Sequence, residues 1–243
     1  LEEGRSLHGH LPWLEMVAVG GTAAALHAGH PYSIDLDQVT PLLKHEFELV
    51  KEGLASWERW HLTRQHRPLL LLGERHGVQL GVRQLRRVIT LEHVRVENLV
   101  VPTVEETLRI KAFLCTERQA VRDFMDLAAL ADKMGEDQTL AALRFLNVLY
   151  EGAGNQTCIT RLAEVTMQDP LDLGRVDLAT YRGIQAPYKS GDYIQRRCQD
   201  IGRSLLFMEM ERAVATDIEE FLKAADVRDL RLTGEGDDPR IVR

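Results

Sequence analysis

The chain has 243 residues, 44% of them hydrophobic, which is enough to bury the core of one large domain or two ordinary ones. No apolar run approaches the roughly 20 residues that cross a bilayer, and the start lacks a leader pattern, so we expect a cytoplasmic protein with no membrane contact. The three cysteines form no C-x-x-C pair, so we expect free thiols. The formal net charge of −7 excludes nonspecific binding of nucleic acid over the whole surface.

Positive charge is concentrated in one part of the chain. Residues 56–97 contain eight arginines, four acidic residues and four of the nine histidines, and no histidine follows His93. This segment therefore carries a charge of about +4 and the remainder about −11. A local basic face is expected within an acidic protein.

The first hundred residues show mixed helix and strand patterns. "LEMVAVGG" predicts a short buried strand that two glycines stop. "TAAALHAGH" predicts a short helix with Thr22 as its N-cap and Gly29 at its end. "YSIDLDQV" alternates and predicts a second strand, with its two aspartates on one face.

A helix over 40–54 is expected next, followed by strands in "WERWHLTRQ", "PLLLLGE" and "GVQLGVRQL". A turn at 74–77 joins the last two of these strands. "VRVENLVVPT" predicts a final edge strand.

Helical patterns dominate beyond Pro102. Thr103 begins a T-x-x-E capping box for a helix over 104–115. A second such spacing at Thr116 precedes "VRDFMDLAALADKMG", whose apolar stripe predicts a helix that ends at Gly135. Further helices are expected over 138–150, 156–167 and 193–225. The predicted fold class is therefore α+β, with a small mixed sheet in a domain over 1–102 and a helical domain over 103–243 that closes one wall of a cleft.

The Gly-Gly turn and the D-x-D strand suggest one device. Asp35 and Asp37 on one strand face lie about 6 to 7 Å apart, close enough to share a hard cation such as Mg²⁺. Gly20 and Gly21 allow backbone N–H groups to approach a phosphate, and the following helix adds its positive end. A metal site beside a phosphate cradle is typical of phosphoryl or nucleotidyl transfer.

The same stretch carries a family resemblance. "GGTAAALHAGHPYSIDLD" resembles the first motif of the nucleotidyltransferase (DNA polymerase β-like) superfamily in its AbiEii/AbiGii-type toxin form. "LRIKAFL" and "ERQAVRDFMDL" are similar to the family's helical lysine and its K/R-D-x-x-D-L element. The resemblance covers about residues 17–130.

The resemblance implies a set of site residues. Asp35 and Asp37 would bind Mg²⁺, and Lys111 would contact phosphate while Asp123 or Asp126 orients it or completes the site. Nucleotide-binding positions would be Gly20, Gly21, Thr22, Ser33, Lys111 and Arg118, and catalytic positions would be Asp35, Asp37, Lys111 and Asp123.

The activity implied by the resemblance is Mg²⁺-dependent transfer of a nucleotide from an NTP to an RNA 3′ end, such as that of tRNA, by the toxin of a toxin–antitoxin or phage-defence system. A cognate antitoxin protein would be its partner. Two alternatives stay open from the residues themselves: a nucleotide-binding module without turnover, and a nucleotidyltransferase that acts on a protein or a small molecule.

The absence of a third strand carboxylate and the surroundings of Lys111 keep alternatives open. "GVQLGVRQL" carries no third carboxylate for metal and base, so Asp123, Asp126 or Glu97 supplies the base, or the toxin-like branch works without one, or the site binds nucleotide without turnover. Lys111 lies among apolar neighbours and either reaches solvent or points into a polar cleft.

The aromatic and basic segment "WERWHLTRQHR" either contacts single-stranded RNA or packs its tryptophans on one face of a strand. The close histidine pairs lack a third zinc ligand. Among the histidines, His30 stands five residues before the D-x-D, where it either contacts phosphate or interacts with a helix end.

Overall fold

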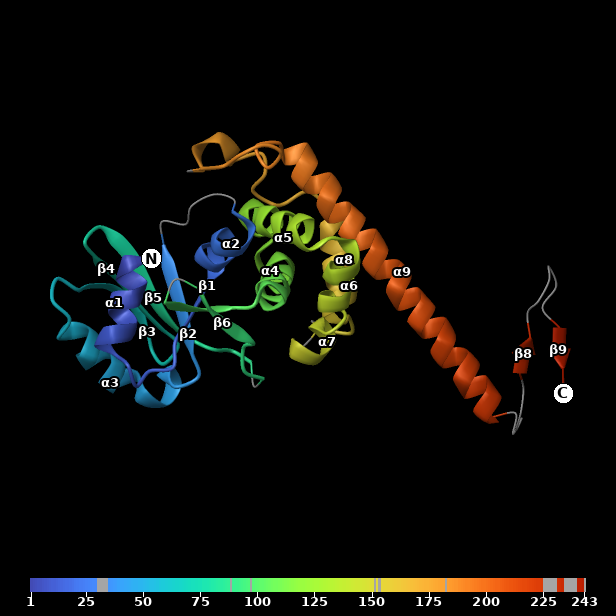
Figure 1. Cartoon of the computed structure of the whole chain (residues 1–243), viewed down its shortest axis with the longest axis horizontal. Helices are drawn as coiled ribbons and strands as arrows, with labels where there is room; N and C mark the ends of the chain where they lie inside the picture. The colour runs from blue at the N-terminus through green and yellow to red at the C-terminus, as the bar shows by residue number, and fades with distance from the viewer. Residues whose placement is uncertain are drawn as a thin grey trace. The chain divides into compact units, whose positions relative to one another are not determined.

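The computed structural model of the chain (Figure 1) describes residues 1–29, 35–87, 89–96, 98–150, 152, 154–181, 183–224, 231–233 and 240–242. Two compact units divide it, Leu1–Arg203 and Ser204–Arg243. The first unit contains the five-stranded sheet and the helices α1 to α8. The predicted domain boundary at Pro102 falls inside this unit, between β7 and α4, and stays a prediction.

A mixed five-stranded sheet organises the N-terminal part of the first unit. Its strands are β1 (Val17–Val19), β2 (Leu36–Thr40), β3 (His61–His66), β4 (Leu70–Arg75) and β5 (Val78–Gln84). The strand order is β1-β2-β5-β4-β3, in which only β2 and β5 run parallel. The predicted α+β class with a small mixed sheet is confirmed.

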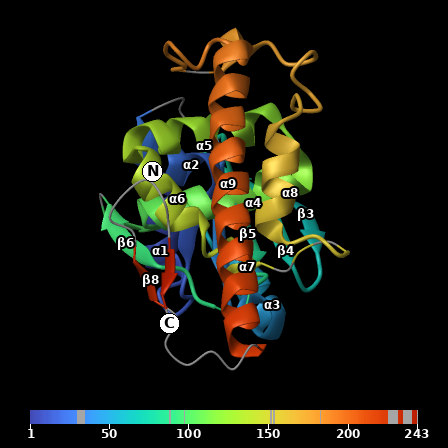
Figure 2. The same ribbon diagram turned by 90° about the vertical axis from the view of Figure 1, so that its right-hand side faces the viewer.

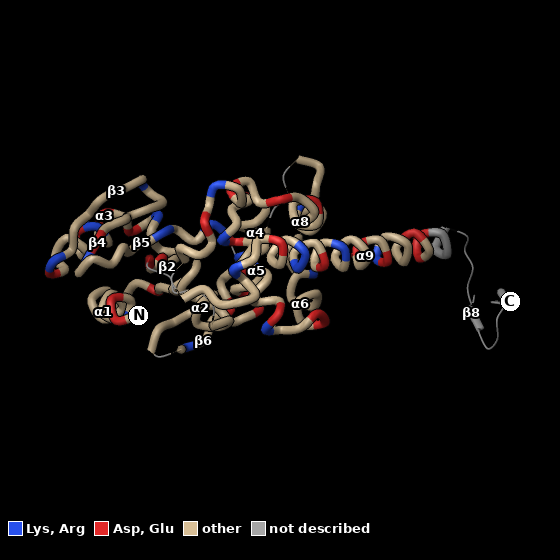
Figure 3. Tube along the Cα trace, turned by 90° about the horizontal axis from the view of Figure 1, so that it is seen from above, with Lys and Arg blue, Asp and Glu red and all other residues tan. Residues whose placement is uncertain are grey.

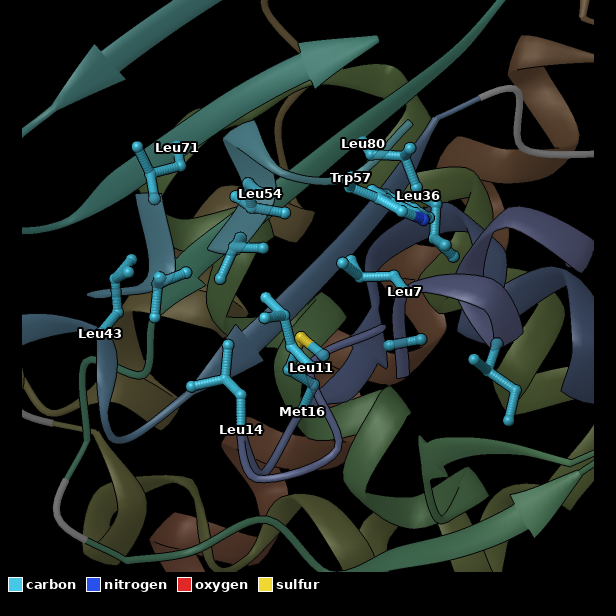
Figure 4. Packing of buried hydrophobic residues seen from close by; sticks show 14 of the residues in the cluster. Leu7, Leu11, Leu14, Met16, Leu36, Leu43, Leu54, Trp57, Leu71 and Leu80 are labelled. Carbon is cyan, nitrogen blue, oxygen red and sulfur yellow. The ribbon is translucent and has the colours of Figure 1, made fainter. Parts of the chain in front are cut away.

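One face of this sheet is buried under two helices, α1 (Glu2–His10) and α3 (Leu43–Ala55). Figure 4 shows the shared core, to which α1, the following loop, α3 and the strands each contribute apolar side chains. Leu36 of β2 and Leu80 of β5 enter this core. Because side chains alternate along a strand, the next residue of each strand faces the other side. The opposite face of β2 and β5 is therefore left for polar residues.

The short helix α2 (Gly20–Ala28) follows β1 directly. It begins at Gly20, which has a φ of +74°, so Thr22 is its third residue and not its N-cap. Gly29 ends the helix in the left-handed conformation, as predicted. The glycine start places the first turn of α2 one residue after the strand.

The predicted single edge strand near residue 100 is wrong in detail. The segment forms a separate hairpin, β6 (His93–Val96) with β7 (Leu99–Pro102), which is not hydrogen-bonded to the main sheet. The residue Asn98 has a φ of +64°, which lets the chain reverse between the two strands.

Helices pack together in the second part of the first unit (Figure 2). They are α4 (Val104–Arg118), α5 (Val121–Met134), α6 (Glu136–Leu143), α7 (Leu146–Leu149) and α8 (Cys158–Thr166). The stripe predicted on α5 is fully buried, and Gly135 ends that helix as expected. The predicted helix start at Thr116 is wrong, because α4 continues to Arg118 and the Thr116 hydroxyl donates to the Phe113 carbonyl.

The first turn of α4 combines an N-cap with a buried ion cluster. The Glu106 N–H donates to the Thr103 hydroxyl at 3.1 Å, as the capping box predicts. The Glu106 carboxylate, however, does not return to the cap. It lies 2.7 Å from Arg87 Nη1 and 3.5 Å from Arg109 Nη2, and all three side chains are buried. This cluster ties the segment after β5 to α4.

The helix α9 (Gly191–Ala224) and a short hairpin complete the chain. The hairpin pairs β8 (Arg231–Thr233) with β9 (Arg240–Val242) in the second unit. Acidic and basic residues alternate along α9 (Figure 3). Over the described part of the chain, no helix combines the length and apolarity needed to cross a membrane. All three cysteines are buried free thiols, as predicted.

Removing the Glu106 carboxylate should destabilise the protein strongly. In Glu106→Ala, Arg87 and Arg109 remain buried without their shared partner, and we expect a loss of about 3–5 kcal/mol in the free energy of unfolding. Glu105→Ala is the matched control, because Glu105 lies in the same turn and forms no ion pair among the described residues. Urea denaturation of both variants measures the difference, and equal losses would show that the cluster contributes little.

Candidate active site

A cleft of about 1460 Å³ lies between the polar face of the sheet and helices α4 and α5. Residues of β2 and β5, the first turn of α2, residues 85–87, 89 and 91, and the segments 147–150 and 180–181 also line it. All of these residues belong to the first compact unit. The cleft brings together elements from both sides of the predicted boundary at Pro102.

Asp37 stands at the centre of the polar face. It faces Val19 across the antiparallel β1–β2 pair and Gly81 across the parallel β2–β5 pair. Its Oδ1 accepts a hydrogen bond from Arg83 Nε at 2.8 Å. A Cβ on Gly81 would lie 2.5 Å from this same oxygen, so the absence of a side chain at Gly81 makes room for the carboxylate.

The Gly-Gly turn lies beside this carboxylate. A Cβ on Gly20 would be 3.9 Å from the second oxygen of Asp37, Oδ2, and both Gly20 and Gly21 line the cleft. The helix α2 starts here, so its free N–H groups and the positive end of its dipole face the site. The predicted juxtaposition of glycine turn and D-x-D is present.

Asp35 and Thr22 meet through the backbone. The Thr22 hydroxyl donates to the Asp35 carbonyl at 2.9 Å, which fixes the entry to β2 against α2. Asp35 itself is exposed and lines the cleft, but β2 begins at Leu36, so Asp35 directly precedes the strand and only Asp37 lies within it. The other predicted positions nearby, Ser33 and His30, lie outside the described residues, as does Glu97.

A buried lysine cluster forms the opposite wall. Lys111 is only 3% exposed, and its Nζ lies 3.0 Å from Asp123 Oδ1 and 2.5 Å from Asp126 Oδ2. Lys111 therefore points into the cleft and not to solvent. Burial alone would lower the pKa of the Lys111 ammonium, but the carboxylates of Asp126 and Asp123 outweigh burial and raise its pKa.

This cluster carries a net charge of −1 when all three groups are ionised. The second carboxylate oxygen of Asp123, Oδ2, is buried and accepts no hydrogen bond from the described residues. Lys111, Asp123 and Asp126 thus lie together, and the orienting role that the resemblance implies for the aspartates stays a prediction.

Four arginines supply the positive charge of the cleft that is not neutralised by carboxylates. Arg64, Arg86, Arg118 and Arg122 line the cleft and are exposed, and their side chains form no hydrogen bond or ion pair with the part of the chain that the structure describes. Arg64 comes from the exposed edge strand β3. Guanidinium groups in such positions are suited to binding phosphate bidentately.

The tryptophans of the segment "WERWHLTRQHR" pack in or against the hydrophobic core. Trp57 is 6% exposed and stacks between His10 and Trp60, while the Arg75 guanidinium lies 4.3 Å from a Trp57 ring centroid. These contacts favour the packing alternative for the tryptophans, while Arg64 and His66 of the same segment line the cleft.

An aromatic pair that sequence reasoning missed also lines the cleft. The rings of Phe113 and Tyr150 stack with centroids 4.1 Å apart, and the Arg87 guanidinium lies 5.6 Å from the Tyr150 ring. Burial raises the pKa of the Tyr150 hydroxyl to about 12 despite this arginine, so the phenol stays neutral. No short-range pattern signals the pair, because 37 positions separate its members.

Asp35 and Asp37 fit a magnesium site that substrate phosphates complete. No group of three or more His, Cys, Asp or Glu side chains in the described ranges forms a metal site from protein ligands alone. Magnesium is often held by one or two carboxylates together with substrate phosphates and water. The two aspartates beside the glycine turn would provide the carboxylates of that donor set.

Comparisons with known proteins give distant similarities. No protein-family model matches the chain. MmpL11 of Mycobacterium bovis and the heme uptake protein MmpL11 of Mycobacterium tuberculosis are 30% identical to it over 113 residues. This match covers 45% of the chain and 11% of the length of those proteins, which is too short an overlap to place the chain in their family.

Solved structures similar to the chain include nucleotidyltransferase-like proteins. JHP933 from Helicobacter pylori is 18% identical, with 88% of this chain and 96% of that chain covered and a TM-score of 0.49. An antigenic nucleotidyltransferase-like protein from Paracoccidioides brasiliensis is 17% identical, with 60% and 85% covered and a TM-score of 0.40. At these values the similarity assigns no activity to this chain.

Neutralising Lys111 should destabilise the wall of the cleft. In Lys111→Met, two carboxylates stay in a buried site without their cation, and we expect the free energy of unfolding to fall by about 3–5 kcal/mol. Lys133→Met on the exposed side of α5 is the control. Urea titrations at neutral pH measure both variants. A loss below about 1 kcal/mol for Lys111→Met would contradict the stabilising role of the cluster.

Proposed function

We propose that this chain is a Mg²⁺-dependent nucleotidyltransferase that moves a nucleotide from an NTP to an acceptor hydroxyl. One observation carries the proposal: Asp35 and Asp37 line one cleft with the glycine start of α2 and with arginines that have no carboxylate partner among the described residues. Each of these features alone is common in proteins. Their combination in one cleft matches the needs of a triphosphate and its metal.

In this proposal each wall of the cleft has its own task. Asp35 and Asp37 hold Mg²⁺, which supplies charge neutralisation on the triphosphate when bound. The N–H groups at Gly20 and Gly21 bind phosphate oxygens, because no Cβ keeps them at a distance. Arg118 and Arg122 approach from the α4–α5 side as the phosphate-binding cations.

The proposed reaction is an in-line displacement at the α-phosphorus. The acceptor oxygen forms a bond to phosphorus, the bond to pyrophosphate breaks, and the hydroxyl proton leaves to a base or to water. The role of Lys111 as a direct phosphate contact stays a prediction, as does that of Asp123 as a catalytic group. Their mutual ion pair supports a positioning role at the seam of α4 and α5.

An RNA 3′ end, such as that of tRNA, is the acceptor we propose. Arg64 and Arg86 extend the cationic lining beyond the triphosphate-binding residues, on β3 and on the segment after β5. A polyanionic acceptor gains from each such contact, whereas a neutral small molecule does not. The cytoplasmic toxin role and a partner antitoxin follow from the sequence resemblance and stay predictions.

A nucleotide-binding module without turnover is the second candidate. It is favoured by the residue that β5 presents to the site, since Arg83 and not a carboxylate stands beside Asp37. A nucleotidyltransferase that modifies a protein or a small molecule is the third.

Labelled NTPs separate these candidates. We expect label to enter RNA with the native chain and Mg²⁺, and Asp37→Asn to lower the rate about 10³-fold, because a lost metal ligand removes several kcal/mol of transition-state stabilisation. Asp169→Asn, an exposed position outside the cleft, is the matched control. Label in protein would move the acceptor to a side chain. Nucleotide binding by calorimetry without any incorporation would support the binding module and overturn the transferase.

The acceptor assignment has its own test through ionic strength. In Arg64→Gln, we expect weaker binding of single-stranded RNA, and the slope of log affinity against log salt concentration should fall by about 0.7 for the lost phosphate contact. Arg175→Gln removes an exposed arginine outside the cleft and should leave the slope unchanged. Fluorescence anisotropy over a salt series measures the slopes. Equal slopes for native and Arg64→Gln chains would contradict RNA contact at β3.

A further inference from the structure

The ion pair between Arg83 and Asp37 lies inside the site that we assign to the metal and the triphosphate. Arg83 Nε donates to Asp37 Oδ1 at 2.8 Å, and the two side chains are 37% and 35% exposed. Both groups are therefore reachable from the cleft, where both are lining residues. The pair is neither a buried structural bridge nor a freely solvated one.

The register of the parallel β2–β5 pair brings these two side chains together. The parallel ladder aligns Asp37 with Gly81 and Val39 with Arg83, so the aspartate and the arginine lie on one face, one pleat apart. Gly81 carries no side chain to separate them. A Cβ at that position would lie 2.5 Å from Asp37 Oδ1 and 3.7 Å from Arg83 Nε, so the glycine is the floor over which the two groups meet.

A divalent cation at Asp37 meets an adjacent positive charge. The positively charged Arg83 guanidinium occupies one of the two oxygens that the cation would use. A bare cation must therefore compete with the guanidinium. A cation that enters with a triphosphate brings several negative oxygens, and a guanidinium can bind phosphate oxygens bidentately. The Arg83 side chain can therefore bind the phosphates as it releases the Asp37 carboxylate.

We propose that Arg83 makes the site selective for the metal–nucleotide complex over the free metal. In the absence of nucleotide it holds Asp37 and excludes divalent cations. When the complex enters, the guanidinium transfers from Asp37 to the phosphates and becomes part of their binding site. Arg83 is thus a positioning and specificity-determining residue, and the inference rests on the proposed nucleotide site at Asp35 and Asp37.

Binding of Mn²⁺ to the full-length chain, followed by the electron paramagnetic resonance signal of the free ion, tests the inference without turnover. We expect Arg83→Gln to raise the Mn²⁺ affinity at least about tenfold without nucleotide. Arg83→Lys keeps the positive charge and should stay close to the native chain. Arg64→Gln removes a cleft arginine that has no carboxylate partner among the described residues and should change the affinity little.

The double variant Asp37→Asn/Arg83→Gln locates the effect, because the gain should vanish without the carboxylate. With a non-hydrolysable NTP analogue present, the order should reverse: the native chain binds Mn²⁺ and analogue more tightly than Arg83→Gln does. Thermal unfolding of each variant checks that it folds, and Arg83→Ala, which also removes the positive charge, carries the comparison if Arg83→Gln does not fold.

An unchanged or lower Mn²⁺ affinity in Arg83→Gln overturns the inference, as does equal affinity gain in Arg64→Gln. Absence of Mn²⁺ binding in every variant with and without the analogue also overturns it. The proposed function fails separately, through the absence of nucleotide incorporation. A chain that binds Mn²⁺ and analogue as expected but transfers no label would retain this role for Arg83 in a nucleotide-binding module.

Discussion

The parallel pairing of β2 with β5 is the constraint on which the candidate site depends. It brings residues more than 40 positions apart into register, and it leaves one face of both strands in the core with Leu36 and Leu80. The other face then presents Asp37 above Gly81. The antiparallel partner β1 ends on the far side of β2, so the glycine turn that starts α2 reaches the same carboxylate. A one-residue slip of this register would turn Asp37 into the core, where an unpaired carboxylate is strongly disfavoured.

The helix α4 carries charged side chains that are buried in two separate ion clusters. Its first turn inserts Glu106 between two arginines, and Lys111 enters the cleft wall between two aspartates of α5. Such buried pairs contribute little net stability when intact, yet removal of either partner is costly. Their effect is geometric: they fix the rotation of α4 about its axis and hold it against the segment after β5. The cleft wall is therefore rigid on the helical side, while its arginines remain available.

Local patterns in the sequence were sufficient for most of the elements and for the place of Asp37 in a strand, although β2 begins one residue after Asp35. Alternation, glycine stops and the Thr103 cap depend on neighbours within a few residues, and these predictions agree with the structure. The Thr22 and Thr116 caps failed, because a glycine with positive φ starts α2 and tertiary packing extends α4 past Thr116. The partner of Asp37 was out of reach for a different reason. The apolar Leu80 and Val82 indicate that Arg83 shares the polar face of β5, but only the strand order reveals which strand lies beside it.

The electrostatics of the cleft reconcile an acidic chain with an anionic substrate. Among the lining residues, seven lysines and arginines stand against five aspartates and glutamates, a local charge of about +2 in a chain of −7. The cations differ in their partners: Lys111 and Arg83 are paired with carboxylates, whereas Arg118 and Arg122 form no ion pair within the described part of the chain. A surrounding negative surface repels polyanions elsewhere and leaves the cleft as the place where they gain contacts. In the proposed site, Arg83 adds a second level of selection. Its guanidinium gains bidentate contacts from the phosphate oxygens of a metal-bound triphosphate as it leaves the Asp37 carboxylate, and a bare cation offers no such contacts.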